Sequence, residues 1–361
     1  MPIFTDLVAA TPLSPDQAMR TAIAAAERVR GTTSPNPPVG CVILDAAGIP
    51  VSVAGTDPVG GPHAEAQSLE MAGERARGGT AVVTLEPCHH HGRTGPCTGA
   101  LIDAGVSQVV YAVDDPNPVA GGGADWLDAR GVDVVRGTLR GEVADGVLRP
   151  WLHWQATRRP HITLKTAGTI DGLAAATDGS SQWITGETAR ARVHVDRARR
   201  DAIIVGTGTV LADDPRLTAR KPDGTLHGHQ PLRVAVGRKE IPDDAAIRGG
   251  FAPGEYVGAA AAEAGKFRHI QTRDMSVVVD VLADLGIIDV LVEGGPRLAG
   301  AFLSAGLVDA VESYVAPGLL GAGTAVVDTA SATTVDDIVR FRTIGVELLG
   351  DDVLIKSVRK G

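Results

Sequence analysis

The stretch from His63 to Cys97 constrains the chain most, because it carries three metal-binding side chains that only a particular fold can bring together. His63 is followed by Cys88 and then by Cys97. Zinc in catalytic sites usually takes three protein ligands and leaves its fourth position for water. We expect these three residues to be the ligands. Glu65 follows the histidine by two residues, close enough to serve that water as general acid and base.

The residues around the three ligands predict that each ligand lies at the end of a helix or strand. The apolar spacing after His63 predicts a helix opening there, and the apolar run 81–85 predicts a buried strand just before Cys88. The segment after Cys97 predicts a helix that ends at Gly105. A cysteine at a helix N-terminus has a lowered pKa, which favours the thiolate that binds metal.

Three other interpretations of this stretch are open at the level of the sequence. A fourth ligand from His89, His90 or His91 would close the coordination shell and make the zinc site structural. A protease dyad of Cys88 and His89 would leave Glu65 without a role, and adjacent side chains in such a loop point apart. A chance match is the third alternative.

The length and composition predict a two-domain α/β protein. A chain of 361 residues exceeds the usual single-domain range of roughly 100 to 200 residues. The boundary is expected between about 141 and 160, which gives domains 1–150 and 151–361. Hydrophobic residues make up 44% of the chain but Phe, Trp and Tyr only 3%, so the core must consist of Val, Leu, Ile and Ala.

Charge, hydropathy and cysteine content narrow the possible binding partners and the cellular compartment. The formal net charge of -9 argues against binding to a nucleic-acid backbone, which needs a basic surface, and favours a small-molecule substrate. No window of 18 uninterrupted apolar residues is present, so we expect no membrane span. Three cysteines, two of them assigned to metal, indicate a reducing compartment. We therefore expect a cytoplasmic protein.

The second half alternates strand-like and helix-like segments, which predicts a mainly parallel sheet with an antiparallel edge. We expect a strand from His161 that breaks at Gly168, a helix starting near Thr209, and a closing hairpin over 346–358. The strand, Gly-Gly turn and helix of VEGGPRLAG would let a phosphate approach backbone N–H groups at a helix N-terminus. The dinucleotide-binding pattern G-x-G-x-x-G is absent.

His-x-Glu followed by Pro-Cys and a further Cys resembles the signature of zinc deaminases that act on amino-substituted bases. In the short form of that signature two residues separate the cysteines, whereas here eight intervene. The long spacing resembles the bifunctional deaminase-reductase family of riboflavin biosynthesis. The segments PNPPVG, DPNP, KTAGTIDG, SSQWIT, GTGTVLADDPRLTAR and VEGGPRLAG also resemble that family, over nearly the whole chain except about 221–273.

The resemblance implies an N-terminal cytidine-deaminase-like three-layer domain and a C-terminal domain like dihydrofolate reductase. It implies zinc-assisted deamination of 2,5-diamino-6-ribosylamino-4(3H)-pyrimidinone 5′-phosphate, with Glu65 moving protons. NADPH reduction of the ribosyl group to ribityl would follow. The cofactors are then Zn²⁺ and NADPH, and the chain is expected to form a homo-oligomer, a dimer through the reductase domain.

The resemblance also implies residue roles. In the deaminase half it puts Asn36, Asp115 and Asn117 at the substrate, although the last two also suit plain turns. The residues implied at NADPH are Ala167, Trp183, Thr209, Asp213, Gly295, Pro296, Arg297 and Leu298. Those implied at the reductase substrate are Ser181, Arg197, Leu217, Arg220 and Glu293, the arginines suiting a phosphate. Lys165 and Asp213 would assist proton delivery to the opened ribose.

Two rival functions belong to other classes. One is a reductase whose zinc domain binds metal without catalysis, and the other is a nucleoside or nucleic-acid deaminase with an appended binding domain. The sequence also departs from the commoner family pattern in two places. His89 replaces a small polar residue, and Gly168-Thr169-Ile170 replaces the usual Ala/Gly-Ser-Leu.

Overall fold

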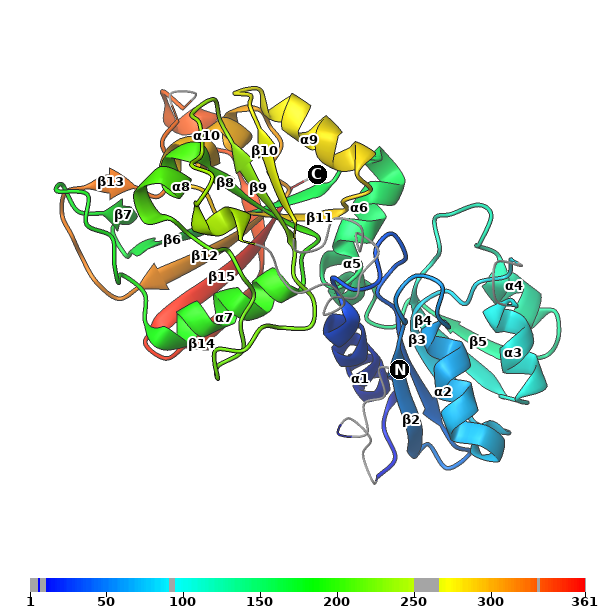
Figure 1. Ribbon diagram of the computed structural model, residues 1–361. Coiled ribbons are helices and arrows are strands. Elements are labelled where there is room, and N and C mark those ends of the chain that lie inside the picture. The colour runs from blue at the N-terminus through cyan, green and yellow to red at the C-terminus, as the bar shows by residue number, and fades with distance from the viewer. Residues whose placement is uncertain (1–5, 7–10, 91–94, 250–265, 330–331, 361) are drawn as a thin grey trace. The chain divides into compact units, whose positions relative to one another are not determined.

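The computed structural model describes residues 6, 11–90, 95–249, 266–329 and 332–360 (Figure 1). The chain forms two compact units, Met1–Thr157 and Arg158–Gly361. The division falls seven residues after the expected boundary at 150, because the helix Arg149–Thr157 belongs to the first unit. Among the described residues, no helix combines the length and apolar character that crossing a membrane requires.

The first unit is a five-stranded sheet in the order β2-β1-β3-β4-β5, with helices on both faces (Figure 1). β1 runs antiparallel to β2 and β3, whereas β3, β4 and β5 are parallel. The elements are α1 (Pro15–Val29), β1 (Gly40–Leu44), β2 (Pro50–Gly55), α2 (Ala64–Ala72), β3 (Thr80–Leu85), α3 (Cys97–Asp103), β4 (Gln108–Val113), α4 (Gly123–Asp128), β5 (Asp133–Arg136), α5 (Arg140–Asp145) and α6 (Arg149–Thr157).

Helix α1 shows how local sequence builds this unit. Ser14 caps the helix in a capping box with Gln17, as the Ser-Pro-Asp-Gln pattern predicts. Its buried face packs closely on β1, because Gly40 leaves no side chain between the two backbones. A Cβ at Gly40 would lie only 1.9 Å from the carbonyl oxygen of Ala22. The fully buried apolar strand β1 is typical of a sheet covered on both faces.

The second unit is an eight-stranded sheet in the order β10-β9-β8-β11-β6-β12-β15-β14. The first six strands are parallel and the last two antiparallel, as the sequence predicts. The elements are β6 (His161–Thr169), β7 (Leu173–Ala175), α7 (Glu187–Ala198), β8 (Ala202–Gly206), α8 (Thr207–Asp213), β9 (Leu232–Val236), β10 (Phe267–Ile270), α9 (Met275–Asp284), β11 (Asp289–Val292), α10 (Pro296–Ser304), β12 (Ala310–Ala316), β13 (Thr324–Ala325), β14 (Phe341–Leu349) and β15 (Asp352–Arg359).

Alternate residues of the central strands build two cores, one on each face of this sheet. Ile204 of β8 packs with the apolar faces of α9 and α10, including Phe302. Its neighbours Ile203 and Val205 belong to a separate cluster with Ile247. Because both faces of the sheet are covered, a ligand can reach it at the carboxyl ends of the parallel strands, where such sheets bind ligands.

Two local expectations are corrected by the structure. The strand from His161 does not break at Gly168 but continues to Thr169, because Gly168 packs tightly and pairs with Val315 of β12. Helix α8 begins at Thr207 rather than near Thr209, since Gly206 already serves as its N-cap. Strands β2, β7, β10 and β13 and helices α5 and α7 were not foreseen from the sequence.

Candidate active sites

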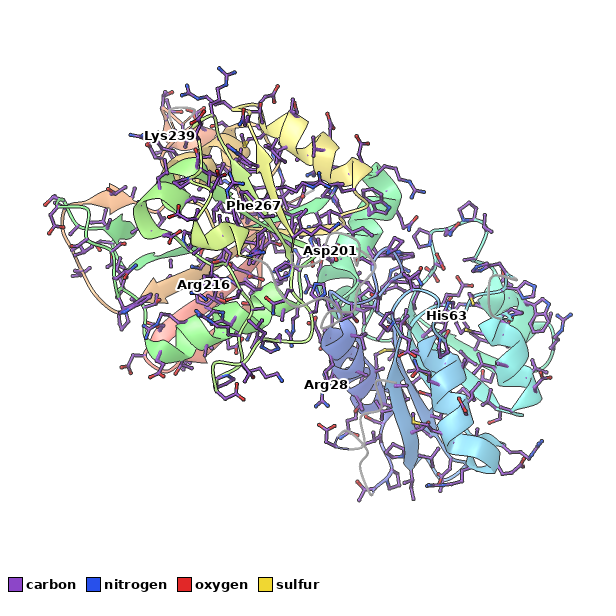
Figure 2. All side chains as sticks on the ribbon, in the orientation of Figure 1. Arg28, His63, Asp201, Arg216, Lys239 and Phe267 are labelled. Atoms are coloured by element: carbon purple, nitrogen blue, oxygen red, sulfur yellow. The ribbon has the colours of Figure 1, made fainter. Side chains whose placement is uncertain are left out.

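The three expected metal ligands converge in the first unit. His63 precedes α2, Cys88 follows β3, and Cys97 begins α3 (Figures 1 and 2). Their donor atoms all lie within 4.8 Å of one another. The Nδ1 atom of His63 is 3.6 Å from Sγ of Cys88 and 3.4 Å from Sγ of Cys97. Tetrahedral zinc bonds place neighbouring N and S ligand atoms about 3.6 Å apart, so both distances from His63 fit a zinc ion.

The electrostatics of the cluster also suit a divalent cation. A hydrogen bond from Cys97 lowers the pKa of the Cys88 thiol, and the same bond raises the pKa of Cys97. The pair therefore holds one negative charge, which in turn raises the pKa of His63. A bound cation would favour two thiolates and a neutral imidazole, because only deprotonated groups ligate.

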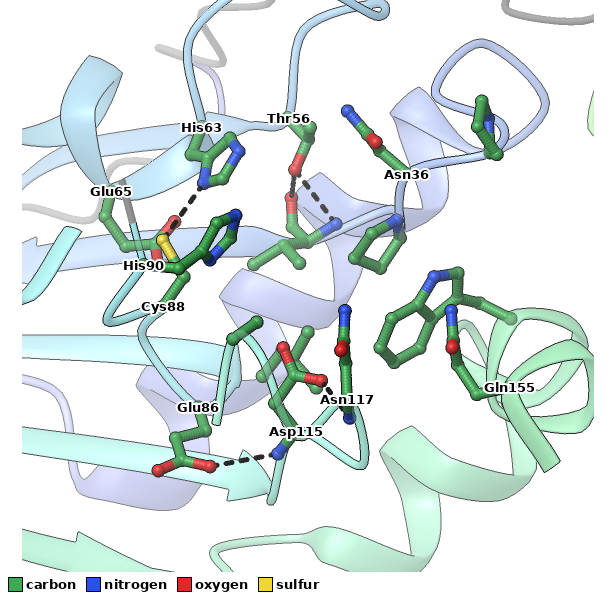
Figure 3. A pocket seen from close by; sticks show the side chains of 16 residues that line it. Asn36, Thr56, His63, Glu65, Glu86, Cys88, His90, Asp115, Asn117 and Gln155 are labelled. Atoms are coloured by element: carbon green, nitrogen blue, oxygen red, sulfur yellow. Dashed lines mark hydrogen bonds between the residues drawn. The ribbon is translucent and has the colours of Figure 1, made fainter. Parts of the chain in front are cut away.

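A cavity of about 220 Å³ opens beside the cluster (Figure 3). The sequence-predicted residues that line it are Asn36, His63, Glu65, Cys88, Asp115 and Asn117. Glu65 is only 4% exposed, and burial raises the pKa of its carboxyl group. Burial also raises the pKa of Asp115. A buried carboxyl group next to a metal cluster can hold a proton and release it, as an acid and base must.

The histidines after Cys88 have different environments. Nδ1 of His89 lies 3.0 Å from the hydroxyl oxygen of Thr98, and its ring packs against Trp126. His89 therefore faces away from the metal cluster. His90 lines the cavity, and its buried Nδ1 has no hydrogen-bond partner among the described residues (Figure 3). His91 lies outside the described residues.

Glu86, which the sequence did not single out, holds the loop that carries Asp115 and Asn117. Its carboxylate accepts a hydrogen bond from the backbone N–H of Asp115 at 3.0 Å and another from Ala124 at 2.9 Å. Trp151 and Gln155 of α6 form a further wall of the same cavity (Figure 3). No sequence pattern pointed to these three residues.

The second unit has a cavity of about 980 Å³ at the carboxyl ends of its parallel strands. The sequence-predicted residues that line it are Thr209, Gly295, Pro296, Arg297 and Leu298. The N-terminus of α10 opens into it behind Gly295, where a phosphate can approach the helix end. Pro296 has no N–H and that of Leu298 donates to the carbonyl oxygen of Gly295 at 3.0 Å, so Arg297 supplies the first N–H of the helix not used in this turn. Among the other residues expected at the cofactor, Trp183 is 70% exposed and Asp213 ends α8 on the surface. These two and Ala167 are not part of the cavity wall.

A polar cluster in the same unit unites most of the expected substrate residues. The guanidinium of Arg197 donates to both carboxylate oxygens of Glu293, at 2.7 and 2.8 Å. Arg197 and His194 both contact the carbonyl oxygen of Thr218, next to Leu217. Arg220 reaches His194 at 3.4 Å. Because Glu293 occupies the fork of Arg197, Arg220 is the more available of the two arginines.

Lys165 of β6 lies beside this cluster. Its Nζ is 5.6 Å from the ring centre of Tyr314, and burial lowers its pKa. Glu293 and Arg197 both act on its charge. Burial alone would raise the pKa of Glu293, but Arg197 outweighs burial and keeps it low, so this carboxylate stays ionised. Ser181, the remaining expected substrate residue, is exposed.

The first unit thus has the sheet and ligand set of a zinc-dependent deaminase, and the second has the parallel sheet and cavity of a nucleotide-dependent reductase. Comparison with known proteins agrees. Residues 14–113 match the model of the cytidine and deoxycytidylate deaminase zinc-binding region, and residues 160–355 match that of the RibD C-terminal domain.

Relatives match along almost the whole chain. The riboflavin biosynthesis protein RibD of Mycobacterium tuberculosis is 48% identical over 96% of this chain and 97% of its own length. That of Escherichia coli is 41% identical over 84% and 88%, respectively. The chain belongs to the RibD family of riboflavin biosynthesis proteins. It is a bifunctional enzyme, a zinc-dependent deaminase and NADPH-dependent reductase that acts on a small molecule.

Solved structures extend this agreement to the fold. A deaminase/reductase from Thermotoga maritima superposes with a TM-score of 0.81 at 32% identity, covering 96% of this chain and 99% of that one. That protein is described as a diaminohydroxyphosphoribosylaminopyrimidine deaminase and 5-amino-6-(5-phosphoribosylamino)uracil reductase. RibD of Acinetobacter baumannii gives a TM-score of 0.79 at 35% identity, with the same coverage.

Proposed function

We propose that the first unit deaminates the phosphorylated diaminopyrimidine and that the second then reduces its ribosyl group with NADPH. The observation that carries the proposal is the cluster of three zinc ligands beside a cavity that His63, Cys88 and the buried Glu65 line. The activities named for the Thermotoga maritima relative support the substrate. Deamination adds water to the amino-bearing carbon and releases ammonia, while reduction adds a hydride and a proton to the opened ribose.

In the deaminase pocket, His63, Cys88 and Cys97 hold the zinc ion. When bound, zinc lowers the pKa of a water molecule to about 7 and so supplies the nucleophile. Glu65 would take up a proton at its carboxylate and pass it to the departing amino group. Its burial supports this role, because burial raises the pKa of its carboxyl group and so makes the protonated form easier to reach.

Asn36, Asp115 and Asn117 orient the pyrimidine in this pocket. Carboxamide and carboxyl groups complement the donors and acceptors on the edge of a pyrimidine ring. All three side chains point toward the cavity beside the metal cluster, which supports this assignment (Figure 3).

In the reductase unit, Thr209 and the turn from Gly295 to Leu298 bind the cofactor, with Ala167, Trp183 and Asp213 as further contacts. NADPH supplies the hydride. The N-terminus of α10 supports this assignment, because its N–H groups favour the negatively charged diphosphate.

Glu293, Arg197, Leu217, Arg220 and Ser181 hold the substrate of the reductase. Lys165 delivers a proton to the opened ribose, with Asp213 as the second candidate for this role. The burial of Lys165 supports its assignment as the proton donor, because burial lowers its pKa and a lysine with a lowered pKa gives up its proton more readily. Asp213→Asn should slow reduction if that residue takes part, and unchanged reduction would remove it from the assignment.

The test separates the two activities by mutation. Glu65→Gln should lower ammonia release by roughly 10² to 10⁴ while zinc content and reduction of pre-deaminated substrate stay at wild-type values. Cys88→Ser should lose zinc as well as deamination. Absence of ammonia release by the wild-type protein, with reduction of pre-deaminated substrate intact, would favour a reductase with a non-catalytic zinc domain, and an unchanged rate in Glu65→Gln would remove Glu65 from its assigned role. Failure of the second unit to bind NADPH would favour the nucleic-acid or nucleoside deaminase.

We also propose that the chain acts in the cytoplasm and forms a homodimer through the reductase unit. Three free cysteines support a reducing compartment. The outermost strand of the larger sheet, β14, exposes Val346 and Leu348 at 65% and 75%, and such an apolar edge favours pairing. Val346→Glu should convert a dimer to a monomer in sedimentation velocity, whereas Val277→Glu on α9 should not. A monomeric wild-type protein would contradict the proposal.

A further inference from the structure

Two neighbouring loops contribute cations to the larger cavity. Lys239 lies three residues after β9, and Arg273 three residues after β10 (Figures 1 and 2). Both line the cavity that holds Thr209 and Gly295. The two strands are parallel, with Ile270 opposite Val236 at their carboxyl ends. The N–H of Gly237 donates to the carbonyl of Ile270 at 3.2 Å, so the loops leave the sheet side by side.

These cations have no anionic partner within the part of the chain that the structure describes. Neither Lys239 nor Arg273 forms an ion pair or side-chain hydrogen bond with a described residue. Asp328 is the one acidic residue among the described side chains of the cavity wall, and it lies 3.9 Å from Arg297. Two exposed cationic side chains therefore line the cavity without an acidic partner among the described residues.

The order of the strands in the sheet indicates which part of a bound dinucleotide would lie near Lys239 and Arg273. Lys165 on β6 and Glu293 after β11 mark the reacting end, and Thr209 after β8 marks the middle of the cavity. β9 and β10 follow β8 toward the edge of the sheet. Lys239 and Arg273 thus lie three and four strands from β6, roughly 14 to 19 Å away at the usual strand spacing. A cofactor whose nicotinamide meets the substrate extends its adenosine toward them.

We propose that Lys239 and Arg273 bind the 2′-phosphate of NADPH and so select it over NADH. The inference rests on the proposed cofactor site and names its specificity-determining residues. The 2′-phosphate carries a negative charge that the hydroxyl group of NADH lacks, so two cations at this position favour NADPH over NADH. A site for NADH would instead place an acidic side chain on the 2′-hydroxyl group.

The test measures dissociation constants of the full-length protein for NADPH, NADH and adenosine 2′,5′-bisphosphate by isothermal titration calorimetry. Lys239→Ala and Arg273→Ala should each weaken NADPH and the bisphosphate about tenfold, and the double variant about 100-fold. NADH binding should stay within about twofold of wild type, which also reports correct folding. Arg238→Ala is the matched control, because this exposed neighbour does not line the cavity.

A second variant tests the cofactor site independently of the phosphate. Gly295 has φ of -64° and ψ of 172°, which a β-branched residue accepts before proline. Its Cβ would point at the Thr209 hydroxyl oxygen, 3.5 Å away, so Gly295→Val should fill the space for the diphosphate and weaken both dinucleotides.

The outcomes separate the two proposals. Loss of both dinucleotides in Gly295→Val, with NADPH unchanged in the Lys239→Ala, Arg273→Ala double variant, would overturn the phosphate assignment and leave the cofactor site standing. Equal weakening of NADPH and NADH in the double variant would also overturn it. A wild-type protein that binds neither dinucleotide would overturn the proposed function itself.

Discussion

Replacing Glu86 by alanine should loosen the loop that carries Asp115 and Asn117. The carboxylate of Glu86 accepts N–H groups from Asp115 and Ala124, so the truncation removes both acceptors at once. An unpaired buried amide costs about 1 to 3 kcal/mol, so the loss of stability from two such amides would lie between about 2 and 6 kcal/mol. The Asp115 amide is only partly buried and can turn to water. We therefore expect the first unit to lose about 2 to 4 kcal/mol of its free energy of unfolding.

Urea unfolding followed by tryptophan fluorescence measures this loss. Three of the four tryptophans lie in the first unit, so a Trp183→Phe background restricts the signal to that unit. Glu86→Gln keeps one acceptor oxygen and should lose about half as much. The KM for ammonia release should rise in both variants while bound zinc stays constant.

Glu70 provides the matched control, because it is an exposed glutamate of the same unit. Glu70→Ala should leave both the free energy of unfolding and KM unchanged. The reasoning would be refuted if Glu86→Ala unfolded within about 0.5 kcal/mol of wild type with an unchanged KM, since surface substitutions fall in that range.

Two further predictions concern the reductase pH profile and the first core. If the protonated Lys165 is the proton donor, reduction should decline as pH rises through a value below the ordinary lysine pKa of about 10.4, because burial lowers its pKa. Lys165→Met should lower reduction of pre-deaminated substrate by roughly 10² to 10⁴ and remove this alkaline limb without changing ammonia release; an unchanged limb would assign it to another group. Gly40→Ala should destabilise the first unit by about 1 to 3 kcal/mol, because its Cβ would meet the Ala22 carbonyl oxygen at 1.9 Å. Gly141→Ala, whose Cβ meets nothing within 4 Å, should be neutral, and the urea unfolding assay described above measures both variants.

The metal cluster could be predicted from the sequence because its chemistry is rare and its spacing is specific. Two cysteines and a histidine each adjoin a predicted helix or strand, so the local pattern already fixes how each ligand enters the site. Asn36, Asp115 and Asn117 entered only through the resemblance, since the same residues suit ordinary turns. The structure brings all three to the cavity wall.

Other parts of the site left no signal in the sequence. The partners of Glu86 are backbone amides 29 and 38 residues away, and no periodicity reports such contacts. Trp151 and Gln155 lie on one helix face whose direction depends on how α6 packs. Strand β10 was not predicted from the sequence. The pairing of β10 with β9, which makes the loops of Arg273 and Lys239 neighbours, therefore could not be predicted either.

In the reductase unit, the positions of the side chains differ in part from what the sequence resemblance implies. Thr209 and Gly295 line the cavity, but Asp213 ends α8 on the surface, six residues after the first residue of that helix. Arg197 lies beside Glu293, but its Nε and Nη2 already donate to the Glu293 carboxylate, and a phosphate would need those same donors. Residue type alone cannot reveal that a side chain is already engaged.

The most direct test of the central claim follows ammonia and NADPH together after zinc-loaded wild-type protein receives the diaminopyrimidine phosphate. The account predicts that ammonia appears first and that NADPH is then oxidised to the same total amount, one for one. NADPH oxidation without ammonia, or before it, would contradict a deaminase and a reductase acting in that order on one molecule.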